Sequence, residues 1–84
     1  MFDANASLRA LEPAARDANA FKARSALIAM RDIVFRARES GTDASIGMRA
    51  CYSAVSGLLG SGKREVRADA VSYTHLTLPT ILLV

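Results

Sequence analysis

Hydrophobic positions along most of this chain of 84 residues recur with the period of an α-helix. Residues 14–40 contain no glycine or proline and are rich in Ala, Arg, Leu and Met, all of which favour helix. Gly41 then predicts a helix end, and either Thr42 or Asp43 is placed to cap a second helix. The pattern therefore predicts two helices, over residues 14–40 and 43–59.

The apolar seams of these two helices predict that they pack together. Because few residues separate them, the expected fold is all-α, an antiparallel helical hairpin. Four small residues on the second helix would allow a backbone to approach closely: Gly47, Ala50, Ala54 and Gly57. The predicted core is Leu27, Met30, Val34, Met48, Cys51, Val55 and Leu59, with Tyr52 on the same apolar arc.

The first eleven residues form a weaker helix candidate, with Phe2, Leu8 and Leu11 as its apolar positions. Pro13 disfavours a helical residue before it and suits the first turn of a helix after it. We therefore expect a short N-terminal helix to end before Pro13 and the longer helix to begin there.

A second apolar stripe lies apart from the main seam of the longer helix. It consists of Phe21, Ile28 and Phe35, spaced by seven residues. A lone hairpin cannot bury it, so we expect it to face the N-terminal segment, further sequence or another copy. This stripe is the main candidate interface in the chain.

Arg24, Arg31 and Arg38 run beside the stripe at the same spacing. Such a ladder could grip phosphates and stack bases, or it could form the polar margin of a helix–helix seam. The second interpretation is favoured because it requires no special assumption. Asp32 and Glu39 share a face of the same helix, and solvated surface is their expected role.

The formal net charge is +3, which invites a nucleic-acid partner. However, the basic residues are interleaved with acids, and nine arginines beside two lysines are typical of a GC-rich genome. No run of apolar residues approaches the roughly 20 that would span a bilayer. A single cysteine and the absence of a visible secretory signal favour the cytoplasm.

The composition changes abruptly after Ala70. All eleven basic and eight acidic residues precede that point, and residues 71–84 contain no alanine either. Residues 71–80, Val-Ser-Tyr-Thr-His-Leu-Thr-Leu-Pro-Thr, resemble one reading frame of the transposon-end adapter used in sequencing libraries, GTC TCT TAT ACA CAT CTG ACG CTG CCG ACG. The resemblance implies an artefact tail over 71–84 that is disordered or poorly packed, and a truncated helical segment over 1–70. The alternative is a native β-strand over 73–78.

Candidate chemistry is sparse. Residues 57–63 match Gly-x-x-x-x-Gly-Lys, but Arg64 replaces the Ser or Thr that holds Mg²⁺, and a helix precedes the loop where a strand is required. Without His75 in the tail, Cys51 has no histidine base and no zinc cluster can form. The sequence therefore predicts no catalytic, metal or cofactor site, and Cys51 is expected in the core.

The leading hypothesis is a non-enzymatic helical module that associates with a second copy or with a helical protein partner. Its candidate interface is Phe21, Ile28 and Phe35 with Arg24, Arg31 and Arg38. Two alternatives remain: a nucleic-acid-binding helical module, and the N-terminal part of a larger enzyme.

Overall fold

The computed structural model describes the backbone of residues 3–83 and the side chains of residues 3–77. In that part the chain forms four α-helices: α1 (Ala4–Ala15), α2 (Ala20–Ser40), α3 (Ser45–Leu58) and α4 (Arg64–Leu83). The all-α prediction is confirmed. The described residues contain no strand, so the β-strand alternative for 73–78 is wrong.

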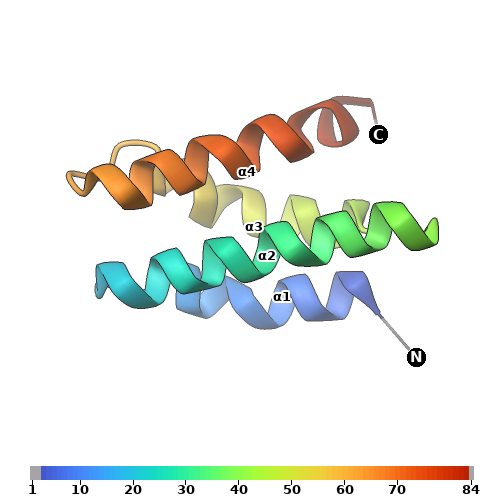
Figure 1. Cartoon of the computed structure of the whole chain (residues 1–84), viewed down its shortest axis with the longest axis horizontal. Coiled ribbons are helices and arrows are strands. Elements are labelled where there is room, and N and C mark those ends of the chain that lie inside the picture. Colours follow the sequence, from blue (N-terminus) through green and yellow to red (C-terminus); the bar gives the residue numbers. More distant parts are fainter. Residues whose placement is uncertain (1–2, 84) are drawn as a thin grey trace.

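Consecutive helices run in opposite directions (Figure 1). Helices α1 and α4 each pack against both α2 and α3. Helices α2 and α3 therefore lie on one diagonal of the bundle, with α2 nearest the viewer and α3 behind (Figure 1). The predicted antiparallel direction is present, but the hairpin is not a directly packed pair. Side chains from α1 and α4 occupy the space between its helices.

The break between the first two helices lies later than predicted. Helix α1 continues through Pro13 and ends at Ala15, so Pro13 belongs to its last turn and does not begin α2. Helix α2 begins after Asn19, whose side-chain Oδ1 accepts hydrogen bonds from the backbone N–H groups of Phe21 and Lys22. An asparagine N-cap satisfies donors that no helical carbonyl can reach, and here it outweighs the proline signal.

The turn between α2 and α3 has the predicted glycine, but α3 begins at Ser45 with Ala44 as its N-cap, so neither Thr42 nor Asp43 is the N-cap residue that the sequence predicted. Gly41 adopts the left-handed conformation (φ 69°), and the N–H of Thr42 returns to the carbonyl of Ala37 at 2.8 Å. Many helices end in this way, with a left-handed glycine followed by a backbone N–H that donates back to a carbonyl of the last turn. Asp43 Oδ1 accepts the N–H of Ser45 at the start of α3, and hydrogen bonds from Ser45 lower the pKa of Asp43.

The core contains the predicted residues together with side chains that only the tertiary structure brings in. Six of the seven predicted positions are buried and the seventh is partly buried, while Tyr52 is 41% exposed. Leu8 of α1 and Tyr73 of α4 enter the centre of the bundle. The predicted members are Leu27, Met30, Val34, Met48, Cys51, Val55 and Leu59.

The expectation of a poorly packed tail is corrected for its first half. Helix α4 continues across Ala70 without a break, and Tyr73 and Thr77 are each only 1% exposed. Tyr73 packs in the core, and Leu76 is partly buried against it. The packing expectation for residues 78–84 lies outside the described side chains.

Candidate interaction surface

The stripe on α2 remains exposed in the folded chain. Phe21 is 78% exposed, Phe35 47% and Ile28 38%. At about 100° per residue, positions seven apart nearly superimpose on a helix, so these side chains form one row roughly 21 Å long. The row that the sequence singled out is therefore exposed, and among the side chains that the structure describes none buries it.

The exposure follows from how α2 sits in the bundle. Its buried residues, such as Met30 and Val34, lie on the opposite side of the helix from the stripe. Helices α1 and α4 flank α2, and α3 lies behind it (Figure 1). The face that carries the stripe is therefore the face of α2 that has no neighbouring helix.

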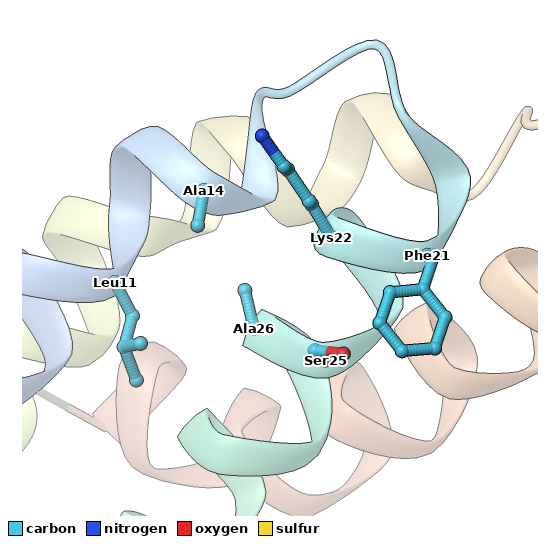
Figure 2. Close-up of a pocket in the computed structure, with 6 residues that line it drawn as sticks. All are labelled: Leu11, Ala14, Phe21, Lys22, Ser25 and Ala26. Carbon is cyan, nitrogen blue, oxygen red and sulfur yellow. The ribbon is translucent and has the colours of Figure 1, made fainter.

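A shallow apolar groove adjoins the stripe at the start of α2. It has a volume of about 330 Å³. Figure 2 shows Leu11 and Ala14 of α1 across the groove from Ala26 of α2, with the Phe21 ring at one side. Lys22 and Ser25 complete the lining. Sequence reasoning missed this groove because it depends on the pairing of α1 with α2.

The three arginines beside the stripe all reach α4. Arg24 Nε forms an ion pair with Asp69 at 2.9 Å. Arg31 donates to the Ser72 hydroxyl at 3.4 Å, and Arg38 donates to the Leu76 carbonyl at 2.6 Å. The structure thus brings the ladder to the seam between two helices, which is the arrangement that the sequence analysis favoured over phosphate binding. Two of these contacts fall in the segment that resembles the adapter.

A row that contains two carboxylates, called the acidic row below, borders the other side of the stripe. Ser25, Asp32 and Glu39 each follow a stripe residue by four positions, which places them about 40° around the helix from it. All three residues are exposed. The stripe is therefore an apolar row with Arg24, Arg31 and Arg38 on one side and Asp32 and Glu39 on the other. Arg36 lies about 40° further around the helix, beyond Asp32.

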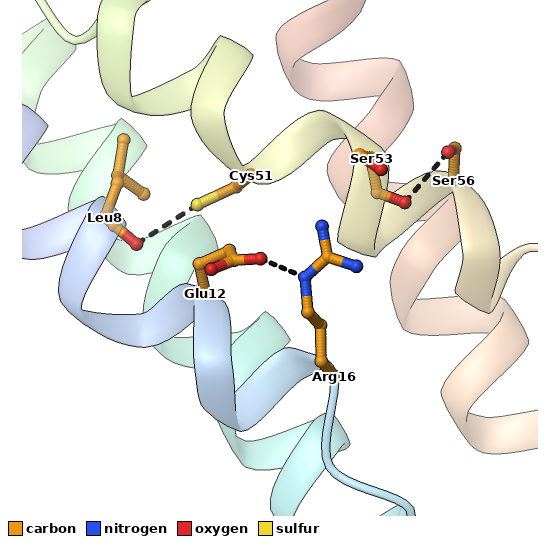
Figure 3. A network of polar contacts seen from close by, with 6 residues as sticks. All are labelled: Leu8, Glu12, Arg16, Cys51, Ser53 and Ser56. Atoms are coloured by element: carbon orange, nitrogen blue, oxygen red, sulfur yellow. Dashed lines mark hydrogen bonds and ion pairs between the residues drawn. The ribbon is translucent and has the colours of Figure 1, made fainter.

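Cys51 lies in the core, where the sequence analysis expected it. Its Sγ donates a hydrogen bond to the Leu8 carbonyl at 3.1 Å, near the ion pair of Glu12 with Arg16 (Figure 3). Burial raises the pKa of the thiol to about 11; the Glu12 carboxylate adds to the increase and Arg16 opposes it. A thiol held in its protonated form is a poor nucleophile, so this site favours packing over catalysis.

Tyr73 packs in the same core and is less well satisfied. Its hydroxyl has no hydrogen-bond partner among the described residues, although the oxygen is buried. Burial raises the pKa of that hydroxyl, and the Cys51 thiol makes a smaller contribution in the same direction. A buried polar group without a partner destabilises the fold.

The remaining candidate motifs gain no support from the geometry. Residues 57–63 cover the end of α3 and the linker to α4. The glycine-rich segment therefore follows a helix, whereas a phosphate-binding loop follows a strand. Among the described residues, no cluster of His, Cys, Asp and Glu could hold a metal ion. His75 is exposed on α4. No helix of the described part is both long enough and apolar enough to cross a membrane.

Comparison with known proteins identifies no relative from which a function could be inferred. No protein-family model, no curated protein and no solved structure matches this chain.

Proposed function

We propose that this protein is a non-enzymatic helical module whose function is association through the exposed face of α2. The single observation that carries the proposal is the row of Phe21, Ile28 and Phe35, which stay exposed at seven-residue intervals along one face of α2. The other exposed large hydrophobic residues of the described part, Ile46, Tyr52 and Val71, form no such row. Repeated spacing of seven is typical of helices that pack along one another. The partner is a second copy of the chain or a helix with a matching apolar row.

The energetics favour association of modest strength. Complete burial of a large apolar side chain stabilises a complex by about 1.5–3 kcal/mol, and part of that gain is already used where the side chain is half-buried. Two stripes would contribute six side chains, against a cost of about 4–15 kcal/mol for association itself. We therefore expect a dissociation constant in the micromolar range, well above that of an obligate dimer.

The described residues of the main intramolecular competitor, Leu8 and Leu11, do not bury the stripe. The sequence analysis considered that Phe2, Leu8 and Leu11 could fold over it. In the structure Leu8 of α1 is fully buried against α3, and Leu11 lines the groove beside α2. Phe2 lies outside the described residues. The described part of α1 therefore leaves the stripe available to a partner.

Nucleic-acid binding is supported less well. A phosphate-binding ladder needs guanidinium groups that point into solvent, and the three arginines that flank the stripe donate to α4. Their positive charge still borders the apolar row, where it can meet carboxylates of a protein partner. We place such a module in the cytoplasm, because its one cysteine is a free and buried thiol.

Sedimentation velocity of the full chain at tens of micromolar tests the proposal. The parent chain is compared with a Phe21→Ser, Phe35→Ser double variant, whose substitutions lie on exposed positions and leave the core intact. Ile46→Ser is the matched control, because Ile46 is 60% exposed on α3, away from the stripe. Circular dichroism checks that each variant keeps its helices.

The expected result is a dimer for the parent and for Ile46→Ser, and a folded monomer for the double variant. A parent chain that stays monomeric up to several hundred micromolar contradicts self-association. A double variant that dimerises as well as the parent contradicts the role of the stripe. Retention of the parent by duplex DNA, lost steeply as salt rises, would favour the nucleic-acid alternative.

A further inference from the structure

The charges that border the stripe favour one relative orientation of two copies over the other. Relative to each stripe residue, the arginine row lies about 60° around α2 in one direction and the acidic row about 40° in the other. The two long edges of the stripe therefore carry opposite charges. When two such faces meet, the direction of one helix relative to the other decides which rows become neighbours.

A two-fold axis parallel to the helices makes the two copies of α2 run in the same direction. That operation brings the arginine row of each copy next to the acidic row of the other, on both sides of the apolar contact. A two-fold axis across the helices makes them antiparallel. Arginines then face arginines on one side, and carboxylates face carboxylates on the other.

The register of the charges fits the parallel arrangement. In a parallel pair without stagger, equal residue numbers lie at equal heights along the axis. Arg31 and Asp32 differ in height by only about 1.5 Å, and the same holds for Arg38 and Glu39. Each arginine of one copy would thus meet a carboxylate of the other at nearly the same level. Arg24 would meet the uncharged Ser25 and keep its ion pair with Asp69.

We propose that the partner of the stripe is a second copy of this chain, with the two α2 helices packed parallel and in register, and with Arg31 and Arg38 of each copy against Asp32 and Glu39 of the other. This inference rests on the proposed function and specifies its partner and orientation. Flanking charges of opposite sign set direction and partner choice in helix pairs of this kind.

The surroundings of α2 leave room for this pairing. The stripe lies on the side of α2 away from its buried residues, and α1 and α4 flank the helix (Figure 1). The three stripe residues stay exposed against the described side chains. Arg31 is half-buried and reaches Ser72 at 3.4 Å, a long contact that leaves other guanidinium donors for a carboxylate. The same guanidinium can therefore contact α4 and the second copy.

Disulfide trapping on the full chain tests the orientation. Phe21→Cys and Phe35→Cys are made separately, oxidised under mild conditions, and analysed by non-reducing electrophoresis and mass spectrometry. A disulfide requires Cα atoms about 4.4–6.8 Å apart. Parallel packing brings residue 21 beside residue 21 of the other copy, whereas antiparallel packing separates them by roughly 21 Å and brings residue 21 beside residue 35. The parent chain is the control, because its one cysteine, Cys51, is buried.

The expected result is that each variant forms a disulfide-linked dimer with itself, and that a mixture gives no 21–35 product. A mixture that forms mainly the 21–35 product overturns the parallel orientation but leaves self-association intact. A parent that dimerises in solution while neither variant is trapped overturns the use of this face. A parent that is monomeric by sedimentation contradicts the proposed function itself.

Neutralising the acidic row provides a second test whose sign depends on the orientation. Asp32→Asn with Glu39→Gln removes four ion pairs from a parallel dimer, two on each side, so its dissociation constant should rise roughly tenfold. In an antiparallel dimer the same change removes contacts between like charges, and the dissociation constant should fall. An unchanged or lower dissociation constant overturns the proposal. Both residues are exposed, so the variant is expected to fold normally.

Discussion

Gly47 of α3 lies against Leu8 of α1 at a distance that leaves no room for a side chain. A Cβ atom at Gly47 would lie 2.9 Å from the Leu8 Cβ and 3.0 Å from the Asn5 Cα. Asn5 stabilises the contact with two hydrogen bonds. Its Oδ1 accepts the N–H of Gly47 at 2.8 Å, and its Nδ2 donates to the Asp43 carbonyl at 3.1 Å. Within the small-residue strip seen in the sequence, Gly47 is thus the position that allows the close approach of α1, whereas Ala50 is exposed and Gly57 has no neighbour within 4 Å of its Cβ position.

Gly47→Ala is therefore expected to destabilise the fold. Overpacking costs about 1–3 kcal/mol, which exceeds the gain of roughly 1 kcal/mol from replacing glycine by alanine in a helix. Gly57→Ala is the matched control, because Gly57 lies in the same helix and nothing surrounds its Cβ position within 4 Å. Chemical denaturation should show the control equal to or more stable than the parent. A Gly47→Ala variant as stable as Gly57→Ala would mean that α1 does not pack this closely.

Tyr73→Phe is expected to stabilise the chain. The substitution keeps the buried ring and removes a hydroxyl that has no hydrogen-bond partner among the described residues. The gain should be about 1 kcal/mol, since an unpaired buried polar group costs about 1–3 kcal/mol. Thermal and denaturant unfolding measure the difference. A variant less stable than the parent would show that the hydroxyl has a partner, such as a bound water.

Stability should fall at alkaline pH because of Cys51. The pKa of its thiol is about 11 in the folded chain, against 9.0 for the ordinary thiol. Between these values the unfolded chain loses the proton and the folded chain keeps it, so folding is favoured fully below about pH 9 and progressively less above it. The full loss corresponds to roughly 2–3 kcal/mol.

Denaturant unfolding between pH 8 and 11 checks this expectation. The measurement is best made in the Tyr73→Phe background, because the raised pKa of Tyr73 shifts stability in the same direction. Adding Cys51→Ala lowers stability overall but should flatten its dependence on pH. An equal slope with and without the thiol would assign the alkaline loss to other groups.

We also propose that residues 71–84 are not encoded by the native gene. The adapter resemblance and the change of composition after Ala70 support this. Two features of α4 agree with a segment that was not selected for this fold. The Tyr73 hydroxyl lacks a partner among the described residues, and the helix passes through Pro79, which has no backbone N–H to donate.

Sequencing of genomic DNA across codon 70, from a library prepared without transposon adapters, checks the proposal. The reading frame is expected to diverge from the present sequence directly after Ala70. The same ten codons in the genome would contradict the adapter origin and make the contacts of Tyr73 native. A divergent sequence would supply new partners for Arg31 and Arg38, whose present contacts are Ser72 and Leu76.

The sequence by itself determined the features that depend on local chemistry and on helical period. Helix-forming composition predicted the all-α class, and Gly41 predicted the end of α2, because a left-handed residue there is strained for most side chains. Apolar period separated the core residues, such as Met30 and Cys51, from the stripe that begins at Phe21. These are properties that a single helix already has before it meets another.

The tertiary structure alone decided which helices are neighbours. The α1–α2 break was predicted at Pro13 and lies at residues 16–19, where a second local signal, the Asn19 cap, begins α2. The pattern of α2 and α3 also predicted a direct hairpin, yet α1 and α4 lie between them because Leu8 and Tyr73 fill the centre. Burial of side chains from distant segments depends on the summed fit of all four helices. The helical period and the helix propensity of a single segment do not predict how well the four helices fit together.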